Sequence, residues 1–488
     1  MWGRRGWAAL GVGVVAPVLV IGGVVRSVAG TGHEGRGGGP GLDGSGHFLL
    51  AVCVILTAAF LGGRLARAIG QPQVVGEICA GLALGPSLLG HFAPAATAWL
   101  FPAPSLRLLD GLAQLGLVLF VFGVGQELAR QSFRGAAAQA VLVSHASMLV
   151  PFAVGALAAT GLLGFAGPRA DPLSFVLFVG CALSITALPV LARILGDLGL
   201  TRTGPGRLSL FAAAVGDGGS WLVLTAVLAG GTLFAVVGAV AVTLLLLGPV
   251  RAALRRWART GRELPTATLT VLLVVAVTAV STVTAALGIH QLIGALLVGV
   301  AWPPPGTGTS TRAGTGRGTS TGTGTSTRAA VERLTSTART VLLPFFFFGF
   351  GLTLDLTALA WDSGTARVLT GLLALAVLAK LAGPGLVARL TGMAWRPALT
   401  VGVLLNARGL TELVVIQIGY QAGIIDRRLL GILTLVALVT TVMTTPLLRL
   451  LDRPLLSRRA RSGARSGGPP SPGSHSPCSN TSDGCRCG

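Results

Sequence analysis

Charge is scarce in this chain, and acidic charge is the scarcest. Asp and Glu account for only 16 of the 488 residues, 11% of residues are charged, and 52% are hydrophobic. The mean hydropathy is +0.77. Soluble globular domains carry roughly a quarter charged residues, so this composition excludes a soluble fold. The sequence also lacks the short alternating pattern of a membrane β-barrel. Apolar runs of bilayer-spanning length recur instead, and they predict an all-α polytopic membrane protein with about 13–14 transmembrane helices.

Lysine is almost absent, because all but one of the 37 basic residues are arginine. The single lysine, Lys380, lies near the middle of the apolar run 364–391. An ammonium group at that depth is costly unless it meets a carboxylate or a water-filled path. The apolar run 206–229 supplies a carboxylate, Asp217. A buried acid and a buried amine in one membrane protein point first to an ion or proton transporter.

The net charge of +21 does not indicate nucleic-acid binding. Arginines gather in alternate connecting segments, such as 251–262 and 312–339, while 91–105 and 164–171 hold few. That is the positive-inside distribution of a membrane protein, and it predicts cytoplasmic termini. The sequence has no P-loop, so transport would be driven by an ion gradient. The cysteines and histidines form no metal or catalytic motif, so we expect no cofactor, no metal beyond a transported cation, and no enzyme activity.

The apolar runs divide the chain around a low-complexity linker. The first run follows a basic N-terminus and is either a signal peptide or a retained helix. The predicted spans are 7–26, 47–66, 72–90, 106–127, 136–163, 172–195, 206–229, 231–250, 266–287, 289–303, 340–358, 364–391, 396–421 and 428–450. The corresponding parts are an N-terminal helix with a Gly-rich loop (1–46), a first membrane part (47–302), a cytoplasmic low-complexity linker (303–339), a second membrane part (340–451) and a disordered basic tail (452–488).

Two of these spans carry helix-breaking residues. Pro189, in SITALPVLARIL at 184–195, removes a backbone donor and frees carbonyls near Ile185 and Thr186. Taken alone, this proline fits a kinked packing helix. The other break is predicted around Gly409, and the two broken spans each stand third in a set of three spans. Broken helices at matching positions of inverted repeats predict a substrate site near the membrane midplane.

The remaining polar residues allow more than one interpretation. Asp217 follows Gly216 in a small-residue helix, where it could bind a cation and a proton in turn or act as a structural ion-pair partner. Arg408 and Glu412 are one helical turn apart and predict a structural ion pair. Glu77 is the other deep acid. It is either structurally hydrogen-bonded or part of the lining of a cytoplasmic funnel.

Four motifs resemble the monovalent cation:proton antiporter-2 family, which contains sodium/proton and Kef-type potassium/proton antiporters. They are GQPQVVGEICAGLALGPSLLG at 70–90, SITALPVLARIL at 184–195, LPFFFFGFGLTLDL at 343–356 and WRPALTVGVLLNARGLTELVVIQIG at 395–419. The resemblance covers about 47–450. It implies thirteen core helices in a dimerisation domain and a six-helix transport domain, two crossing unwound helices, a homodimer and an elevator-like motion.

The resemblance also implies roles for individual residues. Asp217 matches the main ion- and proton-binding carboxylate, and Lys380 matches the lysine beside it. Thr186 and Asn406 fall at the crossing of the two broken helices. The supporting residues are Glu77, Arg408, Glu412 and Gly216.

One position departs from the family pattern. Electrogenic members have two adjacent acids where this chain has Gly216 and Asp217. Either Lys380 pairs directly with Asp217, or the site has lost one charge and exchange is electroneutral. The glycines around Asp217 also leave room for altered or impaired transport.

The sequence as a whole predicts a secondary antiporter in the plasma membrane, with a bacterial cytoplasmic membrane as the expected setting. It would exchange a monovalent cation, Na⁺ or K⁺, for protons, with the lipid bilayer and a second copy of the chain as partners and no nucleic acid. The alternatives are a Kef-like potassium efflux system and an exporter of a small organic or ionophore-like product on the same scaffold.

Overall fold

The computed structural model describes residues 44–130, 137–229, 233–259, 264–287, 290–303, 323–353, 359 and 361–451. The predicted first helix, most of the Gly-rich loop and the basic tail lie outside these ranges. Within them, nine helical segments are long and apolar enough to cross a membrane. The predicted all-α polytopic membrane fold is therefore confirmed, and the chain is a multi-pass membrane protein.

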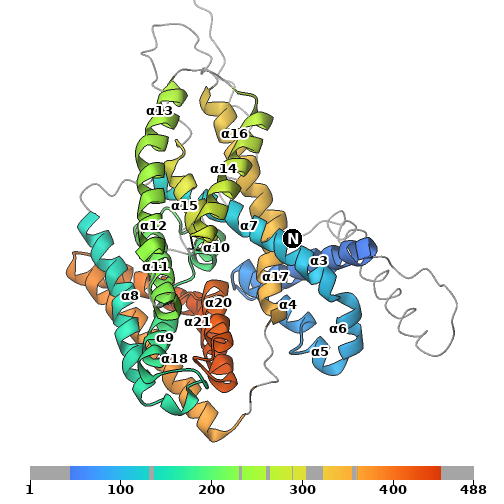
Figure 1. Cartoon of the computed structure of the whole chain (residues 1–488), viewed down its shortest axis with the longest axis vertical. Helices are drawn as coiled ribbons and strands as arrows, with labels where there is room; N and C mark the ends of the chain where they lie inside the picture. The colour runs from blue at the N-terminus through green and yellow to red at the C-terminus, as the bar shows by residue number, and fades with distance from the viewer. Residues whose placement is uncertain are drawn as a thin grey trace, which may run out of the picture.

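The helices follow the predicted spans closely from residue 44 onward (Figure 1). The main elements are α3 (Gly44–Ala68), α4 (Gln73–Leu84), α5 (Leu89–Phe92), α6 (Pro94–Leu100), α7 (Ala103–Arg130), α8 (Ala137–Thr160), α9 (Pro172–Ser184), α10 (Leu188–Asp197), α11 (Gly204–Ala229), α12 (Leu233–Leu245), α13 (Arg251–Arg259), α14 (Thr266–Ala286), α15 (Gln291–Ala301), α16 (Thr323–Thr337), α17 (Leu343–Thr353), α18 (Ser363–Leu390), α19 (Trp395–Leu404), α20 (Leu410–Gln421) and α21 (Arg427–Leu451), with short π-helical segments η3 (Leu246–Val250) and η4 (Ala338–Leu342).

Part of the predicted linker is helical. Helix α16 begins at Thr323, and the apolar segment Ser326–Leu352 is long enough to cross a membrane, whereas the sequence placed this span at 340–358. Ala330, Leu334 and Ala338 are buried and recur at helical spacing. One apolar stripe is enough to pack a helix whose overall composition is polar. Residues 304–322 of the predicted linker lie outside the described ranges.

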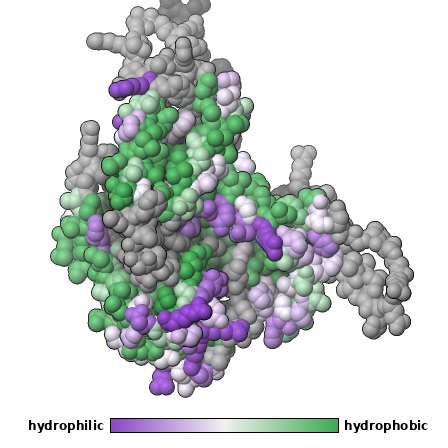
Figure 2. All heavy atoms as spheres, in the orientation of Figure 1, coloured by the Kyte–Doolittle hydropathy of each residue, from purple (hydrophilic) through white to green (hydrophobic). Residues whose placement is uncertain are grey.

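Small residues let these helices approach closely. A Cβ atom on Gly76 of α4 would overlap the carbonyl group of Gly62 of α3, and one on Gly351 of α17 would overlap the carbonyl of Ile78. Such contacts replace the hydrophobic driving force that is missing between helices in lipid. Large apolar side chains such as Val271 and Val275 of α14 face outward instead. Figure 2 shows hydrophobic side chains over much of the outer surface, as expected of a surface in contact with lipid.

Helix contacts divide the molecule into two bundles. The scaffold bundle contains α3, α4, α7, α14, α15, α16, η4 and α17, and the crossing bundle contains α8, α9, α11, α18, α19, α20 and α21. Helix α10 contacts both bundles, and we assign it to the crossing bundle because the chain links it directly to α9 and Ala187, just before it, is hydrogen-bonded to Ala407. In Figure 1, α3 to α6 lie on one side of the molecule and α8, α9 and α18 on the other. The bundles meet mainly where α10 packs against α4 and α7 and where α11 touches α7.

The two predicted sets of three helices pack member against member. Helix α7 packs on α17, and α8 packs on α18. The third members are both interrupted, and the interruptions touch, because Ala187 N donates a hydrogen bond to Ala407 O at 3.2 Å. This arrangement supports the predicted inverted repeats and places both breaks in the crossing bundle.

Candidate functional site

The first break separates α9 from α10. Helix α9 ends at Ser184, Ile185 and Ala187 are extended, and α10 begins at Leu188 with Pro189 in its first turn. The sequence placed this break correctly. A proline has no amide hydrogen and fixes its own φ, so it fits the first turn of a new helix better than the interior of a continuous one.

The second break separates α19, which ends at Leu404, from α20, which begins at Leu410. Gly409 caps the new helix in an extended conformation. The two breaks are tied together by the Thr186 hydroxyl, which donates to Leu405 O at 3.0 Å, and by the backbone bond from Ala187 to Ala407. Four half-helices therefore end at one buried crossing.

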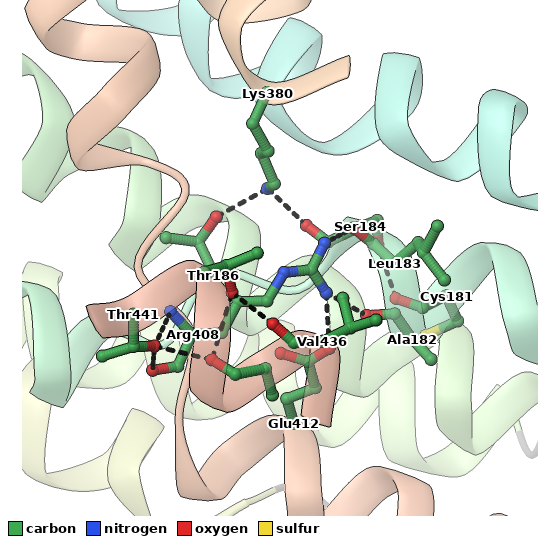
Figure 3. A network of polar contacts seen from close by, with 12 residues as sticks. Cys181, Ala182, Leu183, Ser184, Thr186, Lys380, Arg408, Glu412, Val436 and Thr441 are labelled. Carbon is green, nitrogen blue, oxygen red and sulfur yellow. Dashed lines mark hydrogen bonds and ion pairs between the residues drawn. The ribbon is translucent and has the colours of Figure 1, made fainter. Parts of the chain in front are cut away.

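Two buried cations cap the carboxyl end of α9 (Figure 3). Arg408 donates from Nη1 to Ala182 O at 3.1 Å and from Nη2 to Leu183 O at 2.7 Å, and Lys380 Nζ donates to Ser184 O at 2.6 Å. The last carbonyls of a helix lack partners within the helix and carry the negative end of its dipole. The positive charges of Lys380 and Arg408 thus stabilise a helix end that stops inside the membrane.

Lys380 fills all three of its donor positions with neutral oxygens. Besides Ser184 O, its ammonium group donates to Ser147 O at 2.8 Å and to the Thr186 hydroxyl at 2.6 Å, and the residue is fully buried. In the described ranges no ion pair joins Lys380 to Asp217. The alternative of a direct Lys380–Asp217 salt bridge is therefore not present in this structure, because α8 and the end of α9 satisfy the ammonium group.

Arg408 and Glu412 form the ion pair that their spacing predicts, and both are fully buried. Thr441 of α21 holds the backbone of this segment, since its hydroxyl accepts from Arg408 N at 3.1 Å and donates to Arg408 O at 2.7 Å. The second break therefore carries a charged pair whose guanidinium group also reaches the first break.

Asp217 lies on α11, which packs against α8 and α19, and only 5% of its surface is exposed. Its Oδ1 atom has no hydrogen-bond partner among the described residues. A Cβ on the neighbouring Gly216 would have only Ser147 Oγ near it, at 4.0 Å, so there is free space on that side. Ser147 links the two parts of the site, because its carbonyl oxygen binds Lys380.

Asn406 lies in the second break and is fully buried. Neither its Oδ1 nor its Nδ2 atom has a partner within the described part of the chain. Buried polar atoms are usually hydrogen-bonded, and each unpaired one costs free energy. The unpaired oxygens of Asp217 and Asn406 are therefore candidates for binding a ligand that carries positive charge.

Glu77 lies at a different place, where α4 meets α10. Its Oε1 atom accepts from Arg193 Nη2 at 3.1 Å and from Gln73 Nε2 at 2.9 Å. Glu77 is thus buried and hydrogen-bonded between two helices. Sequence reasoning missed Arg193, although a cation inside an apolar helix is the same signal that drew attention to Lys380.

The arrangement provides the Asp217 carboxylate, the Glu412 carboxylate paired with Arg408, hydroxyl and carbonyl oxygens, and positively charged side chains in an apolar surrounding. Oxygen ligands of this kind suit hard monovalent cations as well as protons. In the part of the chain that the structure describes, no three His, Cys, Asp or Glu side chains form a resident metal site. A buried carboxylate with a free oxygen, such as that of Asp217, is chemically able to bind a cation or a proton.

The chain is similar to known membrane proteins over most of its length. A family model described as the transmembrane part of sodium/hydrogen exchangers matches residues 54–450. Cation/H(+) antiporter 19 of Arabidopsis thaliana is 34% identical over 85% of this chain and 50% of its own length. Na(+)/H(+) antiporter NhaS4 of Synechocystis is 33% identical over 82% of this chain and 95% of its own length.

The fold is shared with a solved structure as well. The sodium proton antiporter MjNhaP1 of Methanocaldococcus jannaschii superposes with a TM-score of 0.53 at 14% identity, over 84% of this chain and 99% of its own. The chain spans about half the length of the plant antiporters that it matches.

Proposed function

Since the chain belongs to the transmembrane sodium/hydrogen exchanger family, we propose that it exchanges a monovalent cation, Na⁺ or K⁺, for protons across the plasma membrane. The observation that carries this proposal is the buried, unpaired carboxylate oxygen of Asp217 in the bundle where two broken helices cross. Relatives of this chain include proteins named as Na⁺/H⁺ and K⁺/H⁺ antiporters. We also propose that the chain is a transporter and not an enzyme. We further propose that it forms a homodimer in the lipid bilayer.

In this proposal Asp217 is the carrier residue and the crossing is its support. Asp217 binds either the cation or a proton, because a buried carboxylate cannot keep an uncompensated charge. Asn406 supplies a neutral ligand from the second break, and Thr186 holds the two breaks together. Lys380 fixes the end of α9 through its three hydrogen bonds to backbone and hydroxyl oxygens.

The proposed exchange is electroneutral, with one cation for one proton. Asp217 is the acid of the site, and Gly216 supplies no second carboxylate. Among the described residues no acid pairs with Lys380, so the proposal assigns it no change of charge when the cation enters. A clamped membrane potential should leave the exchange rate unchanged. The free space beside Gly216 admits an acid, so Gly216→Asp should make the rate sensitive to the potential.

Proteoliposomes with an imposed pH gradient test the function directly. Addition of Na⁺ or K⁺ should collapse the gradient in the wild-type protein and leave it intact in Asp217→Asn. Asp110→Asn is the matched control, because Asp110 is exposed and accepts a hydrogen bond from Gln114 of its own helix, at 3.5 Å. If the wild-type protein is folded but neither Na⁺ nor K⁺ collapses the gradient, the antiport proposal is wrong. Efflux or export of a larger solute should then be tested next.

A further inference from the structure

One polar network joins the two bundles. Its centre is Arg193 on α10, a fully enclosed cation of the crossing bundle with 3% of its surface exposed. Arg193 Nη2 pairs with Glu77 Oε1 of α4 at 3.1 Å, and Nη1 donates to the carbonyl oxygen of Arg339 in η4 at 2.9 Å. Both partners belong to the scaffold bundle, so a single side chain binds two scaffold elements.

A second residue of α10 repeats this link. Asp197 lies one turn after Arg193 and pairs with its Nε atom at 3.4 Å. Asp197 Oδ2 also accepts from the backbone amide of Gln73, in the first turn of α4, at 3.1 Å. Gln73 then donates its side-chain amide to Glu77, which closes a ring of contacts between α4 and α10. We call Gln73, Glu77, Arg193 and Asp197 the α4–α10 latch.

The packing beside this latch is incomplete. A cavity of about 500 Å³ lies between the bundles, and Gly123 of α7, Ala192 of α10, Leu210 of α11 and Thr335 of α16 are among its lining residues. Arg339, whose carbonyl oxygen accepts a hydrogen bond from Arg193, lines the same cavity, so the cavity reaches a direct partner of the latch. At this place the bundles are therefore held by specific polar contacts next to open space. A permanent contact between them could be apolar instead, because a buried ion pair adds little stability over good hydrophobic packing.

We propose that the α4–α10 latch is releasable and that its opening is a step of the transport cycle. In the described arrangement the latch fixes α10 against the scaffold bundle. Moving the crossing bundle past the scaffold requires Arg193 to leave Glu77 and the Arg339 carbonyl. Charged partners suit such a contact, because both sides become hydrated when they separate and regain a unique register when they close. This inference rests on the proposed cation/proton exchange.

A reversible crosslink tests the latch. In a background without the native cysteines, the pair Gln73→Cys and Asp197→Cys places a disulfide between α4 and α10. The matched control is Gln139→Cys with Thr391→Cys, which are hydrogen-bonded at 3.0 Å between α8 and the end of α18 within the crossing bundle. Oxidation should stop exchange in the latch pair and leave it unchanged in the control pair, and reduction should restore it. Full exchange by the crosslinked latch pair would overturn the proposal.

Cation binding separates this test from a test of the function itself. The crosslink leaves Asp217 untouched, so added cation should still raise the Tm of the oxidised protein. If the reduced protein and the wild type both exchange nothing, the proposed function fails. If the wild type is active and only the reduced latch pair is inactive, the variant Glu77→Gln tests whether the latch is releasable. This variant keeps the shape of the contact and removes one charge. If the latch is releasable, Glu77→Gln should change the maximal rate of exchange and leave the half-saturating cation concentration unchanged. A lower Tm with unchanged kinetics would mean a permanent joint.

Discussion

The two helix breaks share a geometry but differ in chemistry. The first break, between α9 and α10, contributes backbone carbonyls and the Thr186 hydroxyl and has no charged residue between its half-helices. The second break, between α19 and α20, contains Asn406 and Arg408. The charges of the second break and of Lys380 neutralise the helix end created by the first. Repeated architecture thus does not require repeated chemistry: one break exposes a helix dipole and the other compensates for it.

The largest effect should come from removing the cation that joins the two breaks. Arg408→Met leaves Glu412 as a buried uncompensated charge and strips the donors from Ala182 O and Leu183 O, so we expect a loss of about 3–5 kcal/mol. Thermal unfolding in detergent measures it. Arg408→Met combined with Glu412→Leu is the control, because it removes both charges. If the double variant is as unstable as the single one, the ion pair is not what the second break depends on.

Removing Lys380 should have a smaller effect on the same helix end. Lys380→Met leaves three buried acceptors without a donor but creates no unpaired charge, so the expected loss is about 1.5–3 kcal/mol. Arg367→Met on the exposed side of α18 is the matched control and should change little. A Tm for Lys380→Met equal to that of the control would show that the ammonium group does not hold the end of α9.

The second break also depends on a hydroxyl from α21. Thr441→Val removes the acceptor for Arg408 N and leaves a buried amide unpaired, which should cost about 1–3 kcal/mol. Thr440→Val is the natural comparison, because the Thr440 hydroxyl donates only to carbonyls of its own helix. Unfolding of the two variants side by side gives the difference. Equal losses would mean that the backbone of the break needs no support from α21.

The membrane spans could be predicted from sequence because bilayer thickness fixes the length of apolar runs. The span expected at 364–391 is α18, Ser363–Leu390, and the one at 136–163 contains α8. The polar helix α16 was assigned to a linker, because the Thr- and Gly-rich composition hid the stripe formed by Ala330, Leu334 and Ala338. Hydropathy measures the whole segment, whereas packing needs only one face.

The candidate site was predictable only in part. Asp217 and Lys380 stand out because charge is rare inside apolar helices, and Pro189 marks the first break. The partners of Lys380 could not be found in this way, since two of the three are backbone carbonyls that any residue could provide. Direct pairing of Lys380 with Asp217 was one of two alternatives, and it is not the arrangement observed: side-chain types suggest charge pairing, while the broken backbone offers acceptors that a sequence pattern does not display.

The smallest difference between the breaks concerns the outer ends of their first half-helices. Asp171 caps α9 by accepting from the amides of Leu173 and Ser174. The pKa of Asp171 is lowered chiefly by a hydrogen bond from the Ser174 side chain and then by these amide bonds. Helix α19 begins after Ala394, which has no side-chain cap.

A lowered pKa in the folded state means that the cap stabilises the protein above the unfolded value of about 4 and that this contribution is lost as the pH falls below it. Asp171→Ala should therefore lower the Tm slightly at pH 7 and not at pH 3. Ala394→Asp should add a cap to α19 and stabilise it by about 1 kcal/mol. If the Tm shifts of the two variants are opposite at pH 7 and both vanish in acid, the two half-helices differ at this end only in their caps. If the Tm of Asp171→Ala is lowered equally at both pH values, the effect comes from packing.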